Sequence, residues 1–377
     1  MRIMEKTIIR NQDWKEIVNK FFFEQCNPYL GIGYRHGFLR SVFVLLRTLY
    51  RPDKKLHDPS NEIKSHRTIA FVFFLNEYLA ATKNKKRVQI DKIIFLDLHN
   101  LKFVRKYLSG TSFVQNIIKF IIKTLKIKGI KYYNRLTYPL LSWLLYNALI
   151  RILSQVQKLN IVTTNMQHPL SLACAQAAVD TGHSSFFCEH ATTPRAVVQP
   201  NNIYHRYFVN FPHTKKMLIQ MGVKKSIILC KHKSLIYKTK KLRKPIKNVG
   251  ICINELDSLS SIVDISCIFL EEKFRLFFRV HDSDSRHHDL EQLALKQKIG
   301  FSSARKTKIN TFLKQIDLVV VGNSNVLADA IIANKKTIYY WAGDPSLFDY
   351  YGLVEYYNVP NACNTNVLVN LLKKNFF

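Results

Sequence analysis

The hydrophobic and polar positions of the chain alternate between short apolar runs and longer amphipathic stretches. The short runs are rich in Ile, Val and Phe, and they lack the period-2 pattern of a strand with one wet face. Strands that are apolar on both sides occur in parallel sheets that helices cover on both faces. We therefore predict a Rossmann-like α/β domain over residues 66–230, with strands in TIAFVFFL, DKIIFLDL, LNIVTTN, SSFFCEH, YHRYFVNF and KSIILCK.

The same alternation starts again after a lysine-rich stretch. Residues 231–247 (KHKSLIYKTKKLRKPIK) contain few core residues and are predicted to be a linker. Strands are then expected in NVGICIN, FRLFFRVH, DLVVVGN and TIYYWAG, with helices between them. This predicts a second Rossmann-like domain over residues 248–345 and a C-terminal tail over 346–377. The fold class is thus α/β, two tandem doubly wound domains, whose ligands bind at the carboxyl ends of the strands.

The N-terminal pattern is different. Residues 1–65 place arginines among large apolar residues, which predicts a helical, basic extension. The segment 113–131 puts lysines on one helix face and isoleucines opposite, which suits either an anionic membrane surface or a core helix with a solvated face. The longest apolar run, Leu136–Ile150, is shorter than the ~20 residues that span a bilayer. No secretory pattern opens the chain, so we expect a cytoplasmic protein.

Charge is the unusual feature of the composition. The 377 residues include 57 Lys+Arg and 26 Asp+Glu, a formal net charge of +31. Such an excess implies an anionic partner: nucleic acid, an acidic membrane face or a phosphorylated substrate. No RNA-recognition consensus, zinc-finger spacing or leucine-zipper heptad is present, so no specific nucleic-acid partner is expected. The seven cysteines lack a framework spacing, which is typical of free thiols in a reducing compartment.

Polar side chains recur just after the predicted strands. They are Asn165, His168, Glu189, His190, Arg279, His281, Asn323, Ser324 and Asn325. Each of them alone is explained by a turn or a helix cap. Together, at four strand ends of parallel sheets, they predict a shared active cleft.

The segment 322–325 (GNSN) opens a predicted helix directly after a buried strand. The backbone amides and the dipole of such a helix start suit a phosphate, although Ser324 or Asn325 also suits a helix cap. Neither G-x-G-x-x-G nor G-x-x-x-x-G-K-[ST] is present, which argues against NAD enzymes and P-loop ATPases. No G-x-S-x-G elbow supports a serine hydrolase.

The string RVHDSDSRHHD invites a metal hypothesis. Residues 282–284 match the D-x-D that holds a divalent metal in single-domain nucleotide-sugar transferases, and His281, His287 and His288 lie close by in sequence. The D-x-D falls in the second domain, however, and the spacing fixes neither the number nor the geometry of ligands. We therefore predict no metal site.

The order of these motifs resembles that of bacterial surface-polysaccharide glycosyltransferases of the GT-B fold. N-x-x-H-P, a helix ending in Gly, and a strand followed by E-H-A, where the family commonly has Q-H-G, occur in the same order. RVHDSD stands in place of R-x-H-P, VVVGNSNVLADAIIANKKTIYY in place of the G-x-S-S/T-x-x-x-E-A helix, and the family's closing D-Y-Y-G is present. The resemblance covers about residues 155–360. It departs at Asp282, Asn325 and Asp329, where the family has Pro, Ser and Glu.

The resemblance implies a donor site in the second domain. Arg279 and His281, with the amides and hydroxyl of residues 323–325, would contact the phosphate of a nucleotide-activated sugar. These groups would stabilise the leaving nucleotide without a divalent metal or another cofactor. Capsule-type sialyl- and Kdo-transferases and teichoic-acid polyol-phosphate transferases share this scheme. A CMP-, CDP-, UDP- or GDP-linked donor therefore stays open.

The resemblance also implies an acceptor site in the first domain. His190 would be the general base toward an acceptor hydroxyl, and Glu189 would orient its ring or be the base itself. His168 and Asn165 would line the substrate cleft. Glu77 and Asp97 are further candidates for the base.

These roles predict an enzyme that extends capsule, O-antigen or lipooligosaccharide at the cytoplasmic face of the inner membrane. Its partners would be a glycan or lipid-linked acceptor and the anionic membrane surface. Two alternatives stay open: a CDP-polyol phosphotransferase on the same scaffold, and a non-catalytic protein that binds nucleic acid or membrane.

Overall fold

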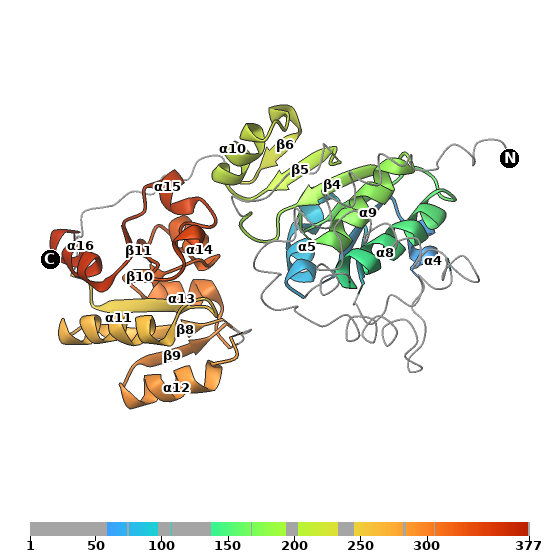
Figure 1. Ribbon diagram of the computed structural model, residues 1–377. Coiled ribbons are helices and arrows are strands. Elements are labelled where there is room, and N and C mark those ends of the chain that lie inside the picture. Colours follow the sequence, from blue (N-terminus) through green and yellow to red (C-terminus); the bar gives the residue numbers. More distant parts are fainter. Residues whose placement is uncertain are drawn as a thin grey trace, which may run out of the picture. The chain divides into compact units, whose positions relative to one another are not determined.

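The computed structural model divides the chain into two units (Figure 1). It describes residues 59–96 with a gap at 74, residue 107, residues 137–193 with a gap at 167, residues 203–232, and residues 245–375 with gaps at 282–283 and 305. The first unit holds the described residues up to Lys231, except that Ala191–Arg195 and Phe211–Met217 belong with the second. The predicted extension up to residue 58, the lysine-faced segment 113–131 and most of the linker 231–247 lie outside the described residues.

The first unit is built on one parallel six-stranded sheet. Its strands run in the order β2-β1-β3-β4-β5-β6, so the chain changes direction across the sheet between β1 and β3. The elements up to Lys231 are α4 (Ser60–Ser65), β1 (Thr68–Val72), α5 (Leu75–Val88), β2 (Lys92–Phe95), α8 (Thr137–Leu153), β3 (Asn160–Thr163), α9 (Pro169–Asp180), β4 (Ser184–Cys188), β5 (Arg206–Val209), α10 (Pro212–Gln220), η4 (Lys225–Ile227) and β6 (Ile228–Cys230). Of these, α10 belongs with the second unit up to Met217.

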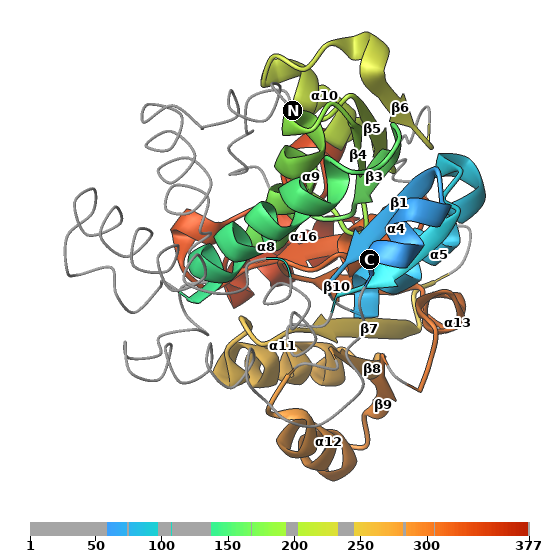
Figure 2. The same cartoon turned by 90° about the vertical axis from the view of Figure 1, so that its right-hand side faces the viewer.

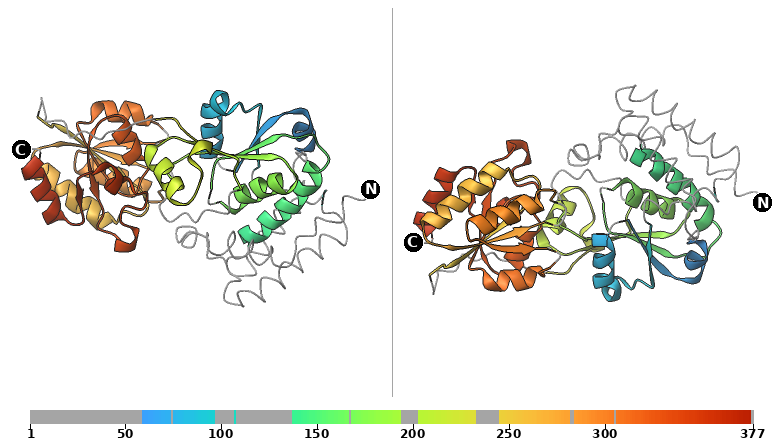
Figure 3. Two further views of the ribbon diagram at one scale, coloured as in Figure 1. Left: turned by 90° about the horizontal axis from the view of Figure 1, so that it is seen from above. Right: turned by 90° about the horizontal axis from the view of Figure 1, so that it is seen from below.

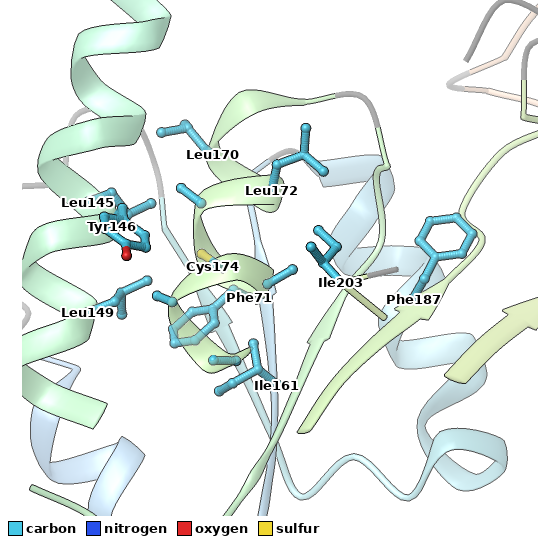
Figure 4. Packing of buried hydrophobic residues seen from close by; sticks show 14 of the residues in the cluster. Phe71, Leu145, Tyr146, Leu149, Ile161, Leu170, Leu172, Cys174, Phe187 and Ile203 are labelled. Atoms are coloured by element: carbon cyan, nitrogen blue, oxygen red, sulfur yellow. The ribbon is translucent and has the colours of Figure 1, made fainter. Parts of the chain in front are cut away.

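The apolar character of β1 on both sides follows from the helices that cover this sheet. Ile69 and Phe71 point into a core formed with α8 and α9, while Ala70 and Val72 pack with residues of α5 on the other face. Figure 3 shows α5 on one side of the sheet and α8 and α9 on the other, and Figure 2 shows α8 and α9 side by side. The close-up in Figure 4 shows Phe71 between α8 and α9 side chains. As predicted, α9 is followed by a glycine, Gly182, at φ 78°.

The second unit is built on another parallel six-stranded sheet, in the order β12-β11-β10-β7-β8-β9. Its elements are β7 (Asn248–Ile253), α11 (Leu259–Glu271), β8 (Arg275–Val280), α12 (His287–Lys296), β9 (Gly300–Ser303), α13 (Ile309–Gln315), β10 (Leu318–Val321), α14 (Val326–Ile332), β11 (Lys336–Tyr340), η5 (Pro345–Leu347), α15 (Leu353–Tyr357), β12 (Asn361–Ala362) and α16 (Thr365–Asn375). One face of this sheet packs with α11, α12 and α16, and the other with α13, α14 and α15.

The predicted fold class, two Rossmann-like doubly wound domains in one chain, is confirmed for the described residues. The predicted strands are present in both sheets. The description of residues 346–377 as a tail needs correction, because β12 pairs with β11 and α16 contributes Leu368 and Leu372 to the second core. The sequence analysis also did not predict β9, which pairs with β8 at the other edge of the sheet.

Candidate functional site

The second sheet has its switch point between β7 and β10, because the chain adds β8 and β9 on one side of β7 and β10, β11 and β12 on the other. Ligands of open α/β sheets bind outside the carboxyl ends of the strands at such a point. A pocket lies there, lined by residues of β7, β10, β11 and the start of α11. Asp257, Ser258 and Ser261 contribute polar groups to it, and Tyr340 and Trp341 contribute aromatic rings. The Ser258 Oγ also caps α11 by accepting the backbone N–H of Ser261 at 3.1 Å.

Asp257 is the acidic residue of this pocket. Its Oδ2 accepts the backbone N–H of Asn254 at 2.9 Å. Its Oδ1 stands beside Gly322, where a Cβ atom would come within 2.9 Å of it. A glycine at this strand end therefore leaves room for the carboxyl group. Burial raises the pKa of Asp257 to about 6, even though the Asn254 hydrogen bond and the charge of Arg286 both lower it.

Arg286, which the sequence analysis missed, holds the loops around the pocket. Its guanidinium donates to both carboxylate oxygens of Asp284, at 2.9 and 2.7 Å, and to the carbonyl oxygens of Asn254 and Asp257. Burial alone would raise the pKa of Asp284, but the hydrogen bonds from Arg286 lower it. The signal for Arg286 in the sequence is an acid and an arginine two residues apart in SDSRHHD. Asp284 thus forms an ion pair within its own loop.

Asn323, predicted to bind the donor phosphate, has a buried side chain that makes three hydrogen bonds. Its Oδ1 accepts the Tyr339 hydroxyl at 2.9 Å and the backbone N–H of Tyr350 at 3.1 Å, and its Nδ2 donates to the carbonyl oxygen of Leu347 at 2.7 Å. The amide therefore ties the segment after β11 to the end of β10. Its side chain positions this loop, and the predicted phosphate contact through the backbone amide of Asn323 stays a prediction.

Ser324 and Asn325 lie at the start of α14. The Ser324 Oγ accepts the backbone N–H of Val326 at 3.3 Å, which leaves the hydroxyl hydrogen for another acceptor. Asn325 is the N-cap residue of α14 but makes no side-chain cap. Its Oδ1 accepts the backbone N–H of Thr192, which belongs to the same unit, at 2.9 Å. Of the predicted trio, Ser324 thus keeps the clearest capacity to donate to a phosphate.

Arg279 and His281, at the end of β8, have opposite surroundings. Arg279 is buried and donates to the carbonyl oxygen of Thr307 at 3.0 Å and to the Ser302 Oγ at 3.4 Å. Its guanidinium carbon lies 5.3 Å from the centre of the Phe312 ring. His281 is exposed just beyond the strand. Arg279 is thus engaged within its own unit, and the assignment of Arg279 and His281 to the donor phosphate stays a prediction.

His190 follows β4 in the first unit, next to the switch point of that sheet. Its Nδ1 is hydrogen-bonded to the carbonyl oxygen of Thr164. A carbonyl oxygen only accepts, so Nδ1 carries the hydrogen and Nε2 keeps its lone pair in the neutral ring. Burial lowers the pKa of His190, and the Thr164 hydrogen bond only partly opposes this. The neutral imidazole is the form that can take a proton.

His168 and Asn165 lie between β3 and α9. The Asn165 Oδ1 accepts the backbone N–H of His168 at 3.1 Å, which shapes the turn into the helix. The His168 ring is buried, with its centre 5.9 Å from that of Phe73. Burial, and then the charge of neighbouring His190, lower the pKa of His168 to about 3. His168 is therefore neutral throughout the physiological range, and its predicted place in the substrate cleft stays a prediction.

Of the three acids proposed as the base, the structure describes two, and both are buried. Glu189 is fully buried, and its carboxylate accepts the backbone N–H of Asn210. The His190 Nδ1 is hydrogen-bonded to the carbonyl oxygen of Thr164, and the role of Glu189, as the group that orients the ring or as the base itself, stays a prediction. Glu77 is also fully buried and accepts the backbone N–H of Phe73 at 2.8 Å. Asp97 lies outside the described residues.

In the described ranges, no three His, Cys, Asp or Glu side chains gather as a metal site would require. None of the helices in that part of the chain has the length and apolar character to span a bilayer. Metal independence and attachment to a membrane surface both remain predictions.

No family model matches the chain, and no curated protein matches it. Similar solved structures include MurG of Acinetobacter baumannii, at 10% identity and a TM-score of 0.48, covering 83% of this chain and 91% of that one. UDP-GlcNAc 2-epimerase of Neisseria meningitidis bound to UDP-GlcNAc has 9% identity and a TM-score of 0.47, covering 81% and 90%. Anabaena HepE in complex with UDP-glucose has 13% identity and a TM-score of 0.44, covering 82% and 90%. Because each TM-score is below 0.5, these similarities carry no argument about activity.

Proposed function

We propose that the chain is a glycosyltransferase that moves a sugar from a nucleotide-activated donor to a growing surface glycan. The observation that carries this proposal is the pocket at the switch point of the second sheet, where open α/β sheets bind their ligands. The motif order that resembles surface-polysaccharide glycosyltransferases supports the same function. The glycan would be a capsule, O-antigen or lipooligosaccharide chain.

On the donor side, the pocket would hold the nucleotide. The exposed ring of His281 and the hydroxyl of Ser324 are the side chains that we assign to the phosphate. Asn323 and Arg279 would position the loops around the phosphate through their side-chain hydrogen bonds. As the bond between sugar and phosphate breaks, negative charge grows on the leaving nucleotide. An imidazole N–H donor and a hydroxyl donor would stabilise this charge without a metal ion.

On the acceptor side, His190 is the base that we propose. An acceptor hydroxyl oxygen attacks the anomeric carbon, the bond from this carbon to the phosphate oxygen breaks, and the hydroxyl proton passes to the His190 Nε2. The hydrogen bond from Nδ1 to Thr164 fixes the tautomer that this step requires. Asn165 and His168 would shape the acceptor side of the site.

The acceptor and the place of action follow from charge. A net charge of +31 favours a lipid-linked acceptor at the anionic cytoplasmic face of the inner membrane. We propose that the chain binds this surface peripherally.

The test is a thermal-shift panel with CMP, CDP, UDP, GDP and a short oligonucleotide, each at low and high salt. A ligand at ~100 times its dissociation constant stabilises by about 2.7 kcal/mol, which is measurable as a rise in Tm. We expect one nucleotide to raise the Tm at both salt concentrations. His281→Ala should reduce its effect, and His288→Ala, at an exposed histidine of α12, should not.

Other outcomes of the panel would contradict the proposal. Selective stabilisation by CDP, followed by turnover of a CDP-polyol and of no nucleotide sugar, would favour the phosphotransferase. Stabilisation by the oligonucleotide alone, abolished by high salt, would favour a non-catalytic binding protein.

A further inference from the structure

The two oxygens of the Asp257 carboxyl group have different surroundings. Oδ2 is used inside the protein, where it accepts the backbone N–H of Asn254 at 2.9 Å. Oδ1 receives no hydrogen bond from the residues that the structure describes, and it stands beside Gly322 at the pocket. A partly buried carboxylate oxygen without a donor is costly unless a ligand supplies one.

Neither neighbouring charged group supplies that donor. Arg286 lowers the pKa of Asp257 through its charge, and Asp284 raises it. The hydrogen bonds of Arg286, however, go to the carboxylate of Asp284 and to the carbonyl oxygens of Asn254 and Asp257, not to the Asp257 side chain. Oδ1 is therefore left without a donor among the described residues, on a side chain that lines the pocket beside Gly322.

The rest of the pocket combines the hydroxyl groups of Ser258 and Ser261 with apolar side chains. Ile253, Ile262 and Trp341 are among its lining residues, and Ala342 and Gly343 add no bulk. A phosphate would be repelled by the Asp257 carboxylate, so the nucleoside part of a nucleotide fits this chemistry better. Guanine pairs with a carboxylate through two N–H groups and needs both oxygens. A base with one exocyclic amino group needs only one.

We propose that the Asp257 Oδ1 accepts a hydrogen bond from the exocyclic amino group of the donor's nucleobase. This inference rests on the proposed function and adds a substrate class to it. The pocket then prefers a cytosine or adenine nucleotide. Uracil presents a carbonyl oxygen at the equivalent position of cytosine, which the carboxylate repels.

Titration calorimetry with CMP, AMP and UMP tests this on the full chain, on Asp257→Asn and on Asp289→Asn. Asp289 is an exposed acid of α12, so its variant matches the change in charge outside the pocket. At pH 7.5 the wild-type carboxyl group is ionised, because its pKa is about 6. The wild type should bind CMP or AMP about 10- to 100-fold more tightly than UMP, the range of one hydrogen bond to a charged group. Which of the two binds identifies the base.

Asp257→Asn should reverse this preference. The asparagine oxygen can still accept the Asn254 N–H, which turns its NH₂ group toward the pocket, where it donates to the uracil carbonyl. We expect weaker binding of CMP or AMP, tighter binding of UMP, and no change in Asp289→Asn. A Tm within a few degrees of wild type shows that each variant is folded.

Three results would overturn the inference, and they are distinguishable. If Asp257→Asn lost the same affinity for CMP or AMP as for UMP, the carboxylate would contact the ribose, which all three share. Unchanged affinities for all three nucleotides would mean that the Asp257 carboxylate does not contact the ligand. If no nucleotide binds even the wild type, the proposed function fails first, and the inference fails with it.

Discussion

Replacing Asp257 by asparagine should change how the stability of the protein depends on pH. The carboxyl group lies between the Asn254 N–H and Gly322. The charged groups that affect its pKa are Arg286 and Asp284. Asparagine keeps the shape and the acceptor for the Asn254 N–H, and it removes the titration. The variant therefore isolates the electrostatic cost of the acid.

The size of the effect follows from the pKa. Burial raises the pKa of Asp257 from 3.8 to about 6. A difference of this size corresponds to about 3 kcal/mol, at about 1.36 kcal/mol per pKa unit. The side chain is only partly buried, so solvent screening reduces the expected effect to about 1–2 kcal/mol.

The sign follows from proton binding. Between about pH 4 and pH 6 the folded protein keeps a proton that the unfolded chain has released. The free energy of unfolding therefore falls as pH rises through this window and changes no further above it. The free energy of unfolding of Asp257→Asn does not fall in this window. The variant therefore becomes more stable relative to the wild type between about pH 4 and about pH 7.

Urea unfolding across this pH range measures the effect, with Asp289→Asn as the control for a surface acid. The difference in the free energy of unfolding between Asp257→Asn and wild type should grow by about 1–2 kcal/mol from low to neutral pH. A difference that stays constant with pH would refute the account of a buried carboxyl group in the pocket.

Two further predictions concern the proposed site. Gly322→Ala places a Cβ 2.9 Å from the Asp257 Oδ1. The free energy of unfolding, measured with heat or urea, should fall by about 1–3 kcal/mol, and nucleotide binding should weaken. An unchanged free energy of unfolding would mean that the carboxyl group moves freely. His190→Gln keeps a donor for the Thr164 carbonyl oxygen but no proton acceptor, so turnover should fall ~10²–10⁴-fold while donor affinity holds. Turnover within ~10-fold of wild type would move the search for the base to Glu189, Glu77 or Asp97.

The central strands of both sheets were predictable from the sequence, because strands covered on both faces need apolar residues at every position. The two strands missed, β9 and β12, are the edges of the second sheet. β9 is Gly-Phe-Ser-Ser and β12 is only Asn-Ala, so neither presents an apolar run. Sequence periodicity cannot identify strands that are held mainly by backbone pairing with one neighbour.

The candidate site was predictable by place and less so by role. Polar residues after strands did mark the carboxyl edges of both sheets. What each side chain binds depends on segments distant in sequence, as when Asn323 binds the loop before α15 and Arg279 binds the segment before α13. Asp257 and Arg286 belong to no motif, and only the folded loops bring them together.

Hydrogen–deuterium exchange with and without the nucleotide selected by the thermal-shift panel tests the central claim most directly. If the nucleotide binds at the switch point of the second sheet, the backbone amides of residues 254–262 and 322–326 should exchange more slowly in its presence. Protection confined to other segments, with these two unchanged, would contradict the placement of the donor site and with it the proposed glycosyl transfer.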